Sequence, residues 1–188
     1  MTAYRKDPPP DILRDMIIYD NGVLRWKPEY FTAARRARRN VNVIGSYDNH
    51  GYLRANFTGA DIGMRNIKVH RIIYWLHTGE WPPVIDHING IKDDNRIENL
   101  RAATEKQNAR NKGLRATNKT GYIGVYYNHG NYSAVVVDED GKRQVVRGFH
   151  DAKHAALFRD LMAHYTYGEF AKLNFLGKSK IRIGGQVI

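Results

Sequence analysis

The chain of 188 residues contains no cysteine. Disulfide frameworks and zinc sites built on thiolates are therefore excluded. No apolar run reaches the length of a membrane span, and the first ten residues, MTAYRKDPPP, lack the apolar centre of a signal peptide. These absences lead us to expect a cytoplasmic protein that has no membrane partner.

Acidic residues are also in short supply. Lys and Arg total 30 against 19 Asp and Glu, which gives a formal net charge of +11 and a pI of about 9.8. Such an excess favours polyanionic partners, with nucleic acid as the first candidate. Proteins that bind ribosomes or membrane surfaces are basic too, so charge alone does not choose among these partners. The length allows one ordinary domain or two small ones.

The N-terminal region carries signals for short strands. Asn21-Gly22 lies between two β-capable runs, Met16–Tyr19 and Val23–Trp26, and this pattern predicts a tight hairpin. Further strands are expected over Val41–Gly45 and Tyr52–Phe57. A helical apolar stretch begins at Arg71 and stops near Gly79. His70 and His77, at the two ends of that stretch, are better explained by packing and hydrogen bonding than by metal binding.

The stretch that organises the chain runs from Val84 to Lys112, with the sequence VIDHINGIKDDNRIENLRAATEKQNARNK. An apolar pair leads into Asp86 and His87, and a polar, turn-rich segment follows. Asn99 closes that segment, and after a second short strand comes a helix that carries Asn108. The helix can bring an amide oxygen back towards the carboxylate. This arrangement predicts a site for a hard metal ion with a histidine beside it.

This stretch resembles the ββα-metal motif of HNH endonucleases, and within them the homing group of phages and introns. His87 matches the first histidine of the motif and Asn99 its central asparagine. Asn108 matches the final position, where that group often has asparagine in place of histidine, and Asp86 matches the carboxylate metal ligand. The resemblance covers residues 84–112.

The resemblance implies roles for these four residues. His87 is expected to take a proton from the attacking water, and Asn99 to hold the orientation of His87 from across the loop. Asp86 and Asn108 are expected to hold a divalent metal ion that contacts the scissile phosphate. Two protein oxygens leave most of the coordination shell to water and phosphate, which favours magnesium, with manganese as the alternative.

Seven cationic side chains of this region are candidate DNA contacts. Those near the motif can bind phosphate or stabilise charge, although a solvated helix face explains Lys106 and Arg110 equally well. The others form a cluster that is either a phosphate-contacting arm or a solvated surface loop, and the nuclease motif favours the arm. The seven are Arg35, Arg36, Arg38, Arg39, Arg101, Lys106 and Arg110.

The C-terminal region predicts a small sheet and one helix. Turn residues separate three expected strands, Tyr122–Tyr127, Tyr132–Asp138 and Arg143–Phe149. Asp151 is a good N-cap for the helix that follows, whose apolar stripe can lie on one face of the sheet.

This region resembles the AP-two/ethylene-response-factor type of DNA-binding domain, from about residue 118 to residue 175. The match rests on segments that include Gly121–Val125, Gly148-Phe149 and Gly168–Ala171. In that family the exposed face of the sheet enters the major groove. Here Ile123 and the run Tyr126–Asn128 depart from the plant pattern, so the plant base preference does not transfer. Candidate DNA contacts, with ordinary sheet surface as the alternative, are Tyr126, Tyr132 and Arg147.

The expected fold is therefore α+β, with a β-rich nuclease region followed by a three-stranded antiparallel sheet packed on one helix. We expect a nuclease domain over 1–113 (core 84–112), a linker over 114–119, the second DNA-binding domain over 120–175 and a basic tail over 176–188. The tail is an added strand, a phosphate-binding arm or a disordered segment, and its sequence does not choose among these.

The expected function is a metal-dependent DNA endonuclease of the phage homing or mobile-element type. Its partner would be double-stranded DNA, nicked by a monomer or cut through both strands by a homodimer, in the host cytoplasm if the gene is phage-borne. One alternative is a non-catalytic, sequence-specific DNA-binding regulator. Another is a structural or packaging-associated phage protein that binds through charge alone.

Overall fold

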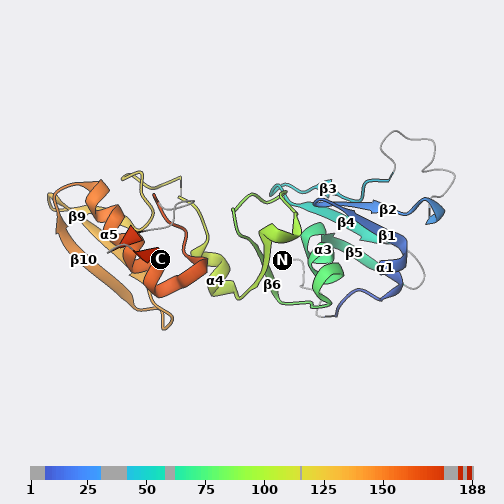
Figure 1. The fold of residues 1–188 in the computed structure, drawn as a ribbon. Helices are drawn as coiled ribbons and strands as arrows, with labels where there is room; N and C mark the ends of the chain where they lie inside the picture. Colours follow the sequence, from blue (N-terminus) through green and yellow to red (C-terminus); the bar gives the residue numbers. More distant parts are fainter. Residues whose placement is uncertain are drawn as a thin grey trace. The chain divides into compact units, whose positions relative to one another are not determined.

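The computed structural model describes residues 7–30, 42–57, 62–114 and 116–175, with the backbone of 182–183 and 186–187. The chain divides into two compact units, Met1–Glu105 and Lys106–Ile188, and each is described by itself (Figure 1). Both units combine helices with small antiparallel sheets. The expected α+β class is confirmed.

The first unit opens with a short helix and a hairpin. Helix α1 (Ile12–Met16) leads into strands β1 (Ile17–Asp20) and β2 (Val23–Trp26), which pair antiparallel. The turn residues Asn21 and Gly22 have φ values of 42° and 92°. Positive φ at both central positions is what a two-residue hairpin turn requires, so the predicted hairpin is confirmed. The 3-10 turn η1 (Pro28–Tyr30) follows β2.

A three-stranded sheet and a helix form the body of this unit. Strands β3 (Ser46–Tyr47), β4 (Leu53–Phe57) and β5 (Met64–Lys68) lie in the order β3-β4-β5. The chain passes straight from β5 into helix α3 (Val69–Thr78), which ends at Gly79 in the left-handed conformation, φ 74°. Strand β5 was not predicted. In the expected strand over 41–45, the described residues show one bridge, between Val43 and Arg25.

Helix α3 supplies the centre of the hydrophobic core. Its residues Val69, Ile72 and Ile73 are fully buried against Leu13, Leu24 and Phe57 of the surrounding elements. Burying one such aliphatic side chain stabilises the fold by about 1.5–3 kcal/mol. The same helix is joined to the start of the next strand, because the Arg71 guanidinium donates to the carbonyls of Pro82 and Pro83.

That strand belongs to the ribbon that carries the motif. Strand β6 (Val84–His87) pairs antiparallel with β7 (Leu100–Ala103), and the 3-10 turn η2 (Ile97–Asn99) immediately precedes β7. Ile85 and Leu100 bury their side chains in the core formed with α3. The two ends of the long loop between the strands are therefore fixed to the core.

The second unit has the predicted sheet and helix. After α4 (Glu105–Arg110) come β8 (Val125–Asn128), β9 (Asn131–Val137) and β10 (Arg143–Phe149), with β9 in the middle. Helix α5 (Ala152–Tyr167) follows, and the Asp151 side chain caps it by accepting from the His154 N–H at 2.9 Å. The end of the helix continues into η3 (Gly168–Phe170). The three strands, the helix and the cap are confirmed.

A buried carboxylate fixes the C-terminal end of this domain. Asp160 on α5 is fully buried and accepts hydrogen bonds from the backbone N–H groups of Asn174 and Phe175, at 2.6 and 3.0 Å. Asn174 in turn accepts from the Ile123 N–H at 2.7 Å. These bonds join the helix, the chain after η3 and the segment before β8.

In the tail, the described backbone forms two short strands, β11 (Arg182–Ile183) and β12 (Gln186–Val187), which pair with each other. No helix within the described ranges combines the length and the apolarity needed to cross a membrane.

Two glycines provide a test of this packing. Gly124 and Gly121 both have positive φ, 68° and 77°. A Cβ on Gly124 would lie 2.6 Å from the Val135 carbonyl oxygen, whereas one on Gly121 would meet nothing within 4 Å. Gly121→Ala should cost about 1–2 kcal/mol through backbone strain, and Gly124→Ala should cost about 1–3 kcal/mol more through the clash. Urea unfolding followed by circular dichroism measures both, and equal losses would show that the contact at Gly124 is not tight.

Candidate active site and DNA interface

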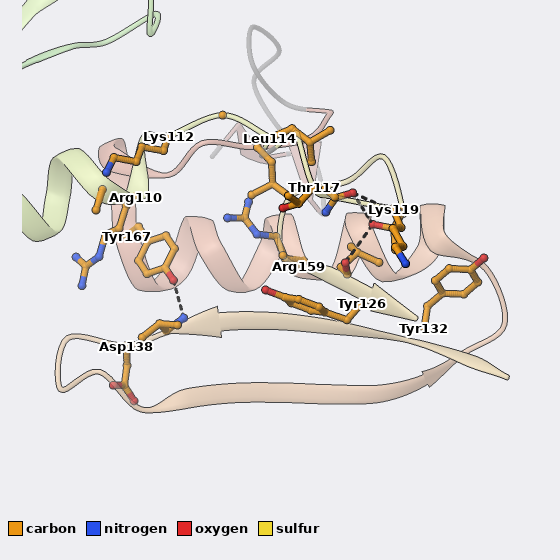
Figure 2. A pocket seen from close by; sticks show the side chains of 18 of the residues that line it. Arg110, Lys112, Leu114, Thr117, Lys119, Tyr126, Tyr132, Asp138, Arg159 and Tyr167 are labelled. Atoms are coloured by element: carbon orange, nitrogen blue, oxygen red, sulfur yellow. Dashed lines mark hydrogen bonds between the residues drawn. The ribbon is translucent and has the colours of Figure 1, made fainter. Parts of the chain in front are cut away.

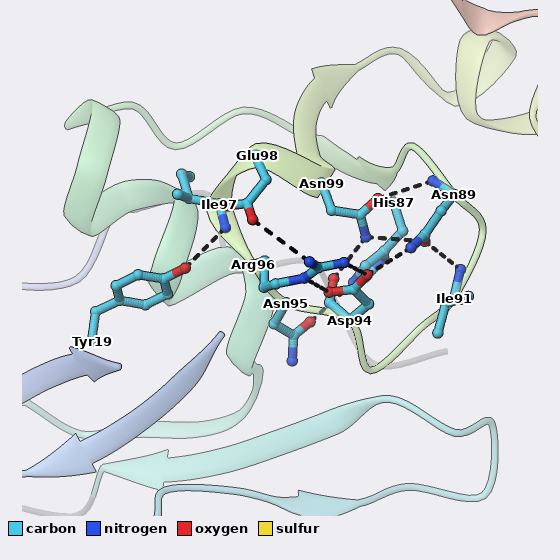
Figure 3. Close-up of polar contacts among 10 residues, drawn as sticks. All are labelled: Tyr19, His87, Asn89, Ile91, Asp94, Asn95, Arg96, Ile97, Glu98 and Asn99. Carbon is cyan, nitrogen blue, oxygen red and sulfur yellow. Dashed lines mark hydrogen bonds and ion pairs between the residues drawn. The ribbon is translucent and has the colours of Figure 1, made fainter. Parts of the chain in front are cut away.

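The candidate general base, His87, is the last residue of β6, and its imidazole is held by Asn95. His87 is buried, and its Nε2 lies 3.0 Å from Asn95 Oδ1 (Figure 3). An amide oxygen only accepts, so with Asn95 Oδ1 facing the ring this hydrogen bond requires a proton on Nε2, which leaves Nδ1 unprotonated in a neutral ring. Burial lowers the pKa of His87, although the hydrogen bond to Asn95 opposes that shift. At neutral pH the ring is therefore uncharged.

Asn99 organises the loop that positions Asn95. Its Oδ1 accepts from the Asn89 N–H at 3.0 Å, and its Nδ2 donates to Asn89 Oδ1 at 3.0 Å and to the Asp94 carbonyl at 2.7 Å (Figure 3). One amide thus joins both sides of the loop. The direct partner of the imidazole is Asn95, which the sequence reasoning missed. The catalytic role of Asn99 stays a prediction.

An ion pair stiffens the same loop. Arg96 donates to both oxygens of Asp94, at 2.8 and 2.7 Å, and the Asn89 amide donates to Asp94 Oδ2 at 2.7 Å. Arg96 holds the pKa of Asp94 down to about 2. The next residue, Ile97, donates its N–H to the Tyr19 hydroxyl at 3.1 Å, which attaches the loop to β1 (Figure 3).

Asp86, the candidate metal ligand, is paired with an arginine across the ribbon. Asp86 and Arg101 are register partners in β6 and β7, and Arg101 Nε and Nη2 donate to Asp86 Oδ2 at 3.0 and 2.8 Å. Both side chains are nearly buried, with exposed fractions of 5% and 11%. Arg101 was predicted to contact phosphate. The structure directs Nε and Nη2 of its guanidinium to Asp86, and its contact with phosphate stays a prediction.

Asp86 and His87 project to opposite faces of the β6–β7 ribbon. Neighbouring strand residues project to opposite faces, so Asp86 shares a face with Arg101, and His87 shares the other with Leu100. Asn108 lies on α4 within the second unit. A metal site shared by Asn108 and Asp86 therefore stays a prediction.

Oxygen is the donor atom in both predicted metal ligands, Asp86 and Asn108. Across the part of the chain that the structure describes, no group of three or more His, Asp or Glu side chains could hold a metal. The predicted pair contains one carboxylate and one amide oxygen. Both are hard donors that fit magnesium or manganese, whereas zinc prefers nitrogen and sulfur.

Two aromatic rings lie beside His87. The sequence did not indicate that either belongs to the site. The His70 ring stands edge-on at 4.7 Å between ring centroids, and the Tyr52 ring lies at 6.0 Å. His70 is buried on α3, and burial is the main cause that lowers its pKa well below the usual value. At the other end of α3, His77 Nδ1 lies 2.8 Å from the Ile73 carbonyl. Both histidines therefore pack, as their positions on the helix indicated.

The sheet of the second unit has one helix-covered face and one open face. Directly paired residues share a face, so Tyr126, Ser133 and Arg147 lie together. Tyr126 and Arg147 are exposed, and the Arg143 guanidinium lies 5.5 Å from the Tyr126 ring centre. This open face carries two of the three predicted DNA contacts.

The third predicted contact lies on the other face. Tyr132 pairs with Tyr127 and Phe149 there, and Tyr132 and Phe149 pack against the buried Val125 and the alanines of α5. Tyr132 therefore helps to support the sheet, and its contact with DNA stays a prediction.

The predicted contacts on α4 lie beside a cavity of about 1100 Å³ in the second unit (Figure 2). Lys106 Nζ donates to the Glu139 carbonyl at 3.0 Å, and Arg110 donates to Glu139 Oε1 at 3.2 Å. The Arg110 guanidinium also lies 4.7 Å from the Tyr167 ring centre. Both cations thus contact their own domain.

The four predicted arginines of the basic cluster, Arg35, Arg36, Arg38 and Arg39, lie outside the described residues.

The region of this site is similar in sequence to known proteins. Residues 68–110 match the model of the HNH endonuclease family. The similarity is to a family of nucleases, and it covers less than half of the chain. The match begins at the end of β5 and takes in α3, β6, β7 and α4, so it includes all four motif residues predicted for catalysis and metal binding.

One relative has the same designation. The chain is 37% identical over 117 residues to an uncharacterized HNH endonuclease of Acanthamoeba polyphaga mimivirus. The alignment covers 61% of this chain and 59% of the viral protein. No solved structure matches the chain at a significant level. The predicted resemblance to HNH endonucleases is confirmed over residues 68–110, and the resemblance of the second unit to AP-two type domains stays a prediction.

The Arg96–Asp94 pair predicts a pH dependence of stability. The folded-state pKa of about 2 lies below the ordinary value of 3.8, so Asp94 stabilises the fold above about pH 4 and loses that contribution as the pH falls towards 2. Asp94→Asn should make the decline of the urea midpoint over this window shallower. Arg96→Gln should do the same, because it removes the cation that holds the pKa down. Profiles parallel to wild type in both variants would contradict the assignment.

Proposed function

We propose that the chain is a metal-dependent DNA endonuclease in which His87 is the general base. The supporting observation is the buried imidazole of His87, whose Nε2 lies at Asn95 Oδ1 within a segment that matches the HNH family. Nδ1 is then the nitrogen that takes the proton from the attacking water.

Fixing the imidazole contributes to the rate. A general base acts efficiently when its lone pair already points at the water, because no rotation has to be frozen during the reaction. Asn95 fixes the tautomer, while Asn99 and the Arg96–Asp94 pair hold the loop from which Asn95 projects. These residues position the base and do not touch the substrate themselves.

Asp86 and Asn108 would hold the metal ion, magnesium in our proposal, with manganese as a substitute. When bound, such a cation stabilises the negative charge that develops on phosphate and leaving oxygen. Arg101 donates to Oδ2 of the Asp86 carboxylate and so helps to hold its orientation.

The second unit would bind double-stranded DNA through its open sheet face. Tyr126, Arg143 and Arg147 provide an aromatic ring and two cations on that face, and a β-sheet with such residues can enter the major groove. The net charge of +11 supports the choice of a polyanion. We further propose a homing or mobile-element enzyme that works in a host cytoplasm, a setting that the viral relative supports.

The decisive experiment is cleavage of supercoiled plasmid in magnesium, manganese or EDTA. Wild type should nick or linearise the plasmid in a metal-dependent way, with nicked circles indicating a monomer and linear products a dimer on DNA. His87→Ala should lower cleavage at least a hundredfold, because it removes the base, and should leave DNA affinity unchanged. His77→Ala is the matched control on α3. Tight, sequence-specific binding without cleavage in any metal would favour the regulator instead.

The open face yields a second prediction. Tyr126 and Tyr127 are neighbours with similar exposure, 53% and 60%, but they lie on opposite faces of the sheet. Tyr126→Ala and Arg147→Ala should each weaken duplex binding by about 1–2 kcal/mol, roughly tenfold. Tyr127→Ala should leave it unchanged. Fluorescence anisotropy with a labelled duplex measures the three affinities, and equal losses for Tyr126 and Tyr127 would argue against this face as the reader.

A further inference from the structure

Two lysine ammonium groups converge on one aromatic ring beside the candidate base. Lys68, the last residue of β5, places Nζ 3.9 Å from the centre of the Tyr52 ring. Lys92, in the loop between β6 and β7, places its Nζ 5.4 Å from the same ring centre. The ring attracts both cations through its negative face, and so holds two long, flexible side chains in one place.

The location of this pair is next to the catalytic histidine. The Tyr52 ring lies 6.0 Å from the His87 ring and 5.6 Å from the His70 ring. Lys92 is also held by a hydrogen bond, because its Nζ donates to the His50 backbone carbonyl at 2.8 Å. The two ammonium groups thus come from separate segments, the sheet edge and the motif loop, and both lie at the Tyr52 ring, whose centre is 6.0 Å from that of the His87 ring.

The charge balance of this cluster is incomplete. Asp48, the acidic group whose charge raises the pKa of Lys68, is already paired with the Arg54 guanidinium. Among the described residues the Lys68 ammonium group makes no ion pair or hydrogen bond. Its partial burial, and after that the charge of Arg54, lower its pKa. A half-buried ammonium without an anion costs free energy, and functional sites are where such costs are retained.

We propose that Lys68 and Lys92, held on the Tyr52 ring, form a binding site for a backbone phosphate of the DNA next to the scissile one. This inference rests on the proposed nuclease function and extends it to the substrate. A lysine ammonium is a compact point charge that suits a phosphate oxygen. A phosphate held here would place the following phosphodiester against the side of the domain where His87 lies.

The experiment measures DNA affinity in EDTA, so that its readout does not depend on cleavage. Each lysine that neutralises a phosphate contributes close to one unit to the slope of log affinity against log salt. Lys68→Met and Lys92→Met should each weaken binding of a short duplex about tenfold and reduce that slope by about one. Lys68→Arg should keep both, because the charge remains. Lys27→Met, on the first hairpin, is the matched control and should change neither.

Cleavage rates then separate this inference from the proposed function. Lys68→Met and Lys92→Met should raise KM for plasmid DNA with a smaller change in kcat. Unchanged affinity and salt slope in both variants would overturn the phosphate site, even if cleavage fell, since the lysines would then act only on the fold around His87. If wild type failed to cut DNA while the slopes fell as stated, the phosphate site would stand and the nuclease proposal would fail. Lys92→Met keeps the test valid if Lys68→Met does not fold.

Discussion

The hydrogen bond between His87 Nε2 and Asn95 Oδ1 is the interaction on which the rest of the site depends. It determines which nitrogen of the ring is protonated, and therefore which one can act as a base. Asn95 can make this bond because Asn99 closes the loop behind it and Tyr19 attaches the loop to the first hairpin. A local chain of bonds thus connects the chemistry of one imidazole to the packing of the whole first unit.

The site retains polar groups at a cost that the core offsets. His70 Nδ1 and Asn95 Nδ2 are buried and have no hydrogen-bond partner among the described residues. Leaving such an atom unsatisfied costs about 1–3 kcal/mol. The apolar face of α3, packed on the first sheet, supplies stabilisation of that order with each aliphatic side chain that it buries. The fold can therefore keep an under-satisfied polar cluster beside His87, where the chemistry is proposed to occur.

Local signals in the sequence predicted most of the fold, while the face and partner of a side chain depended on tertiary register. Asn21-Gly22 and Asp151 determine their turn and cap within a few residues, so both predictions held. Strand β5 was missed because it is short and runs without a break into α3. The face on which Tyr132 lies could not be predicted, because it follows from pairing with β8 and β10. Asn95 went unrecognised because only the closed loop brings it to His87.

The most direct test of the account is the tautomer of His87, read from two-bond proton–nitrogen correlation spectra of histidine-labelled protein at neutral pH. His87→Ala assigns the signal by its disappearance. We predict a neutral ring protonated at Nε2 in wild type, and a mixture of tautomers in Asn95→Ala, where the amide oxygen is gone. A wild-type ring that is protonated at Nδ1, or charged at neutral pH, would contradict the assignment of His87 Nδ1 as the base.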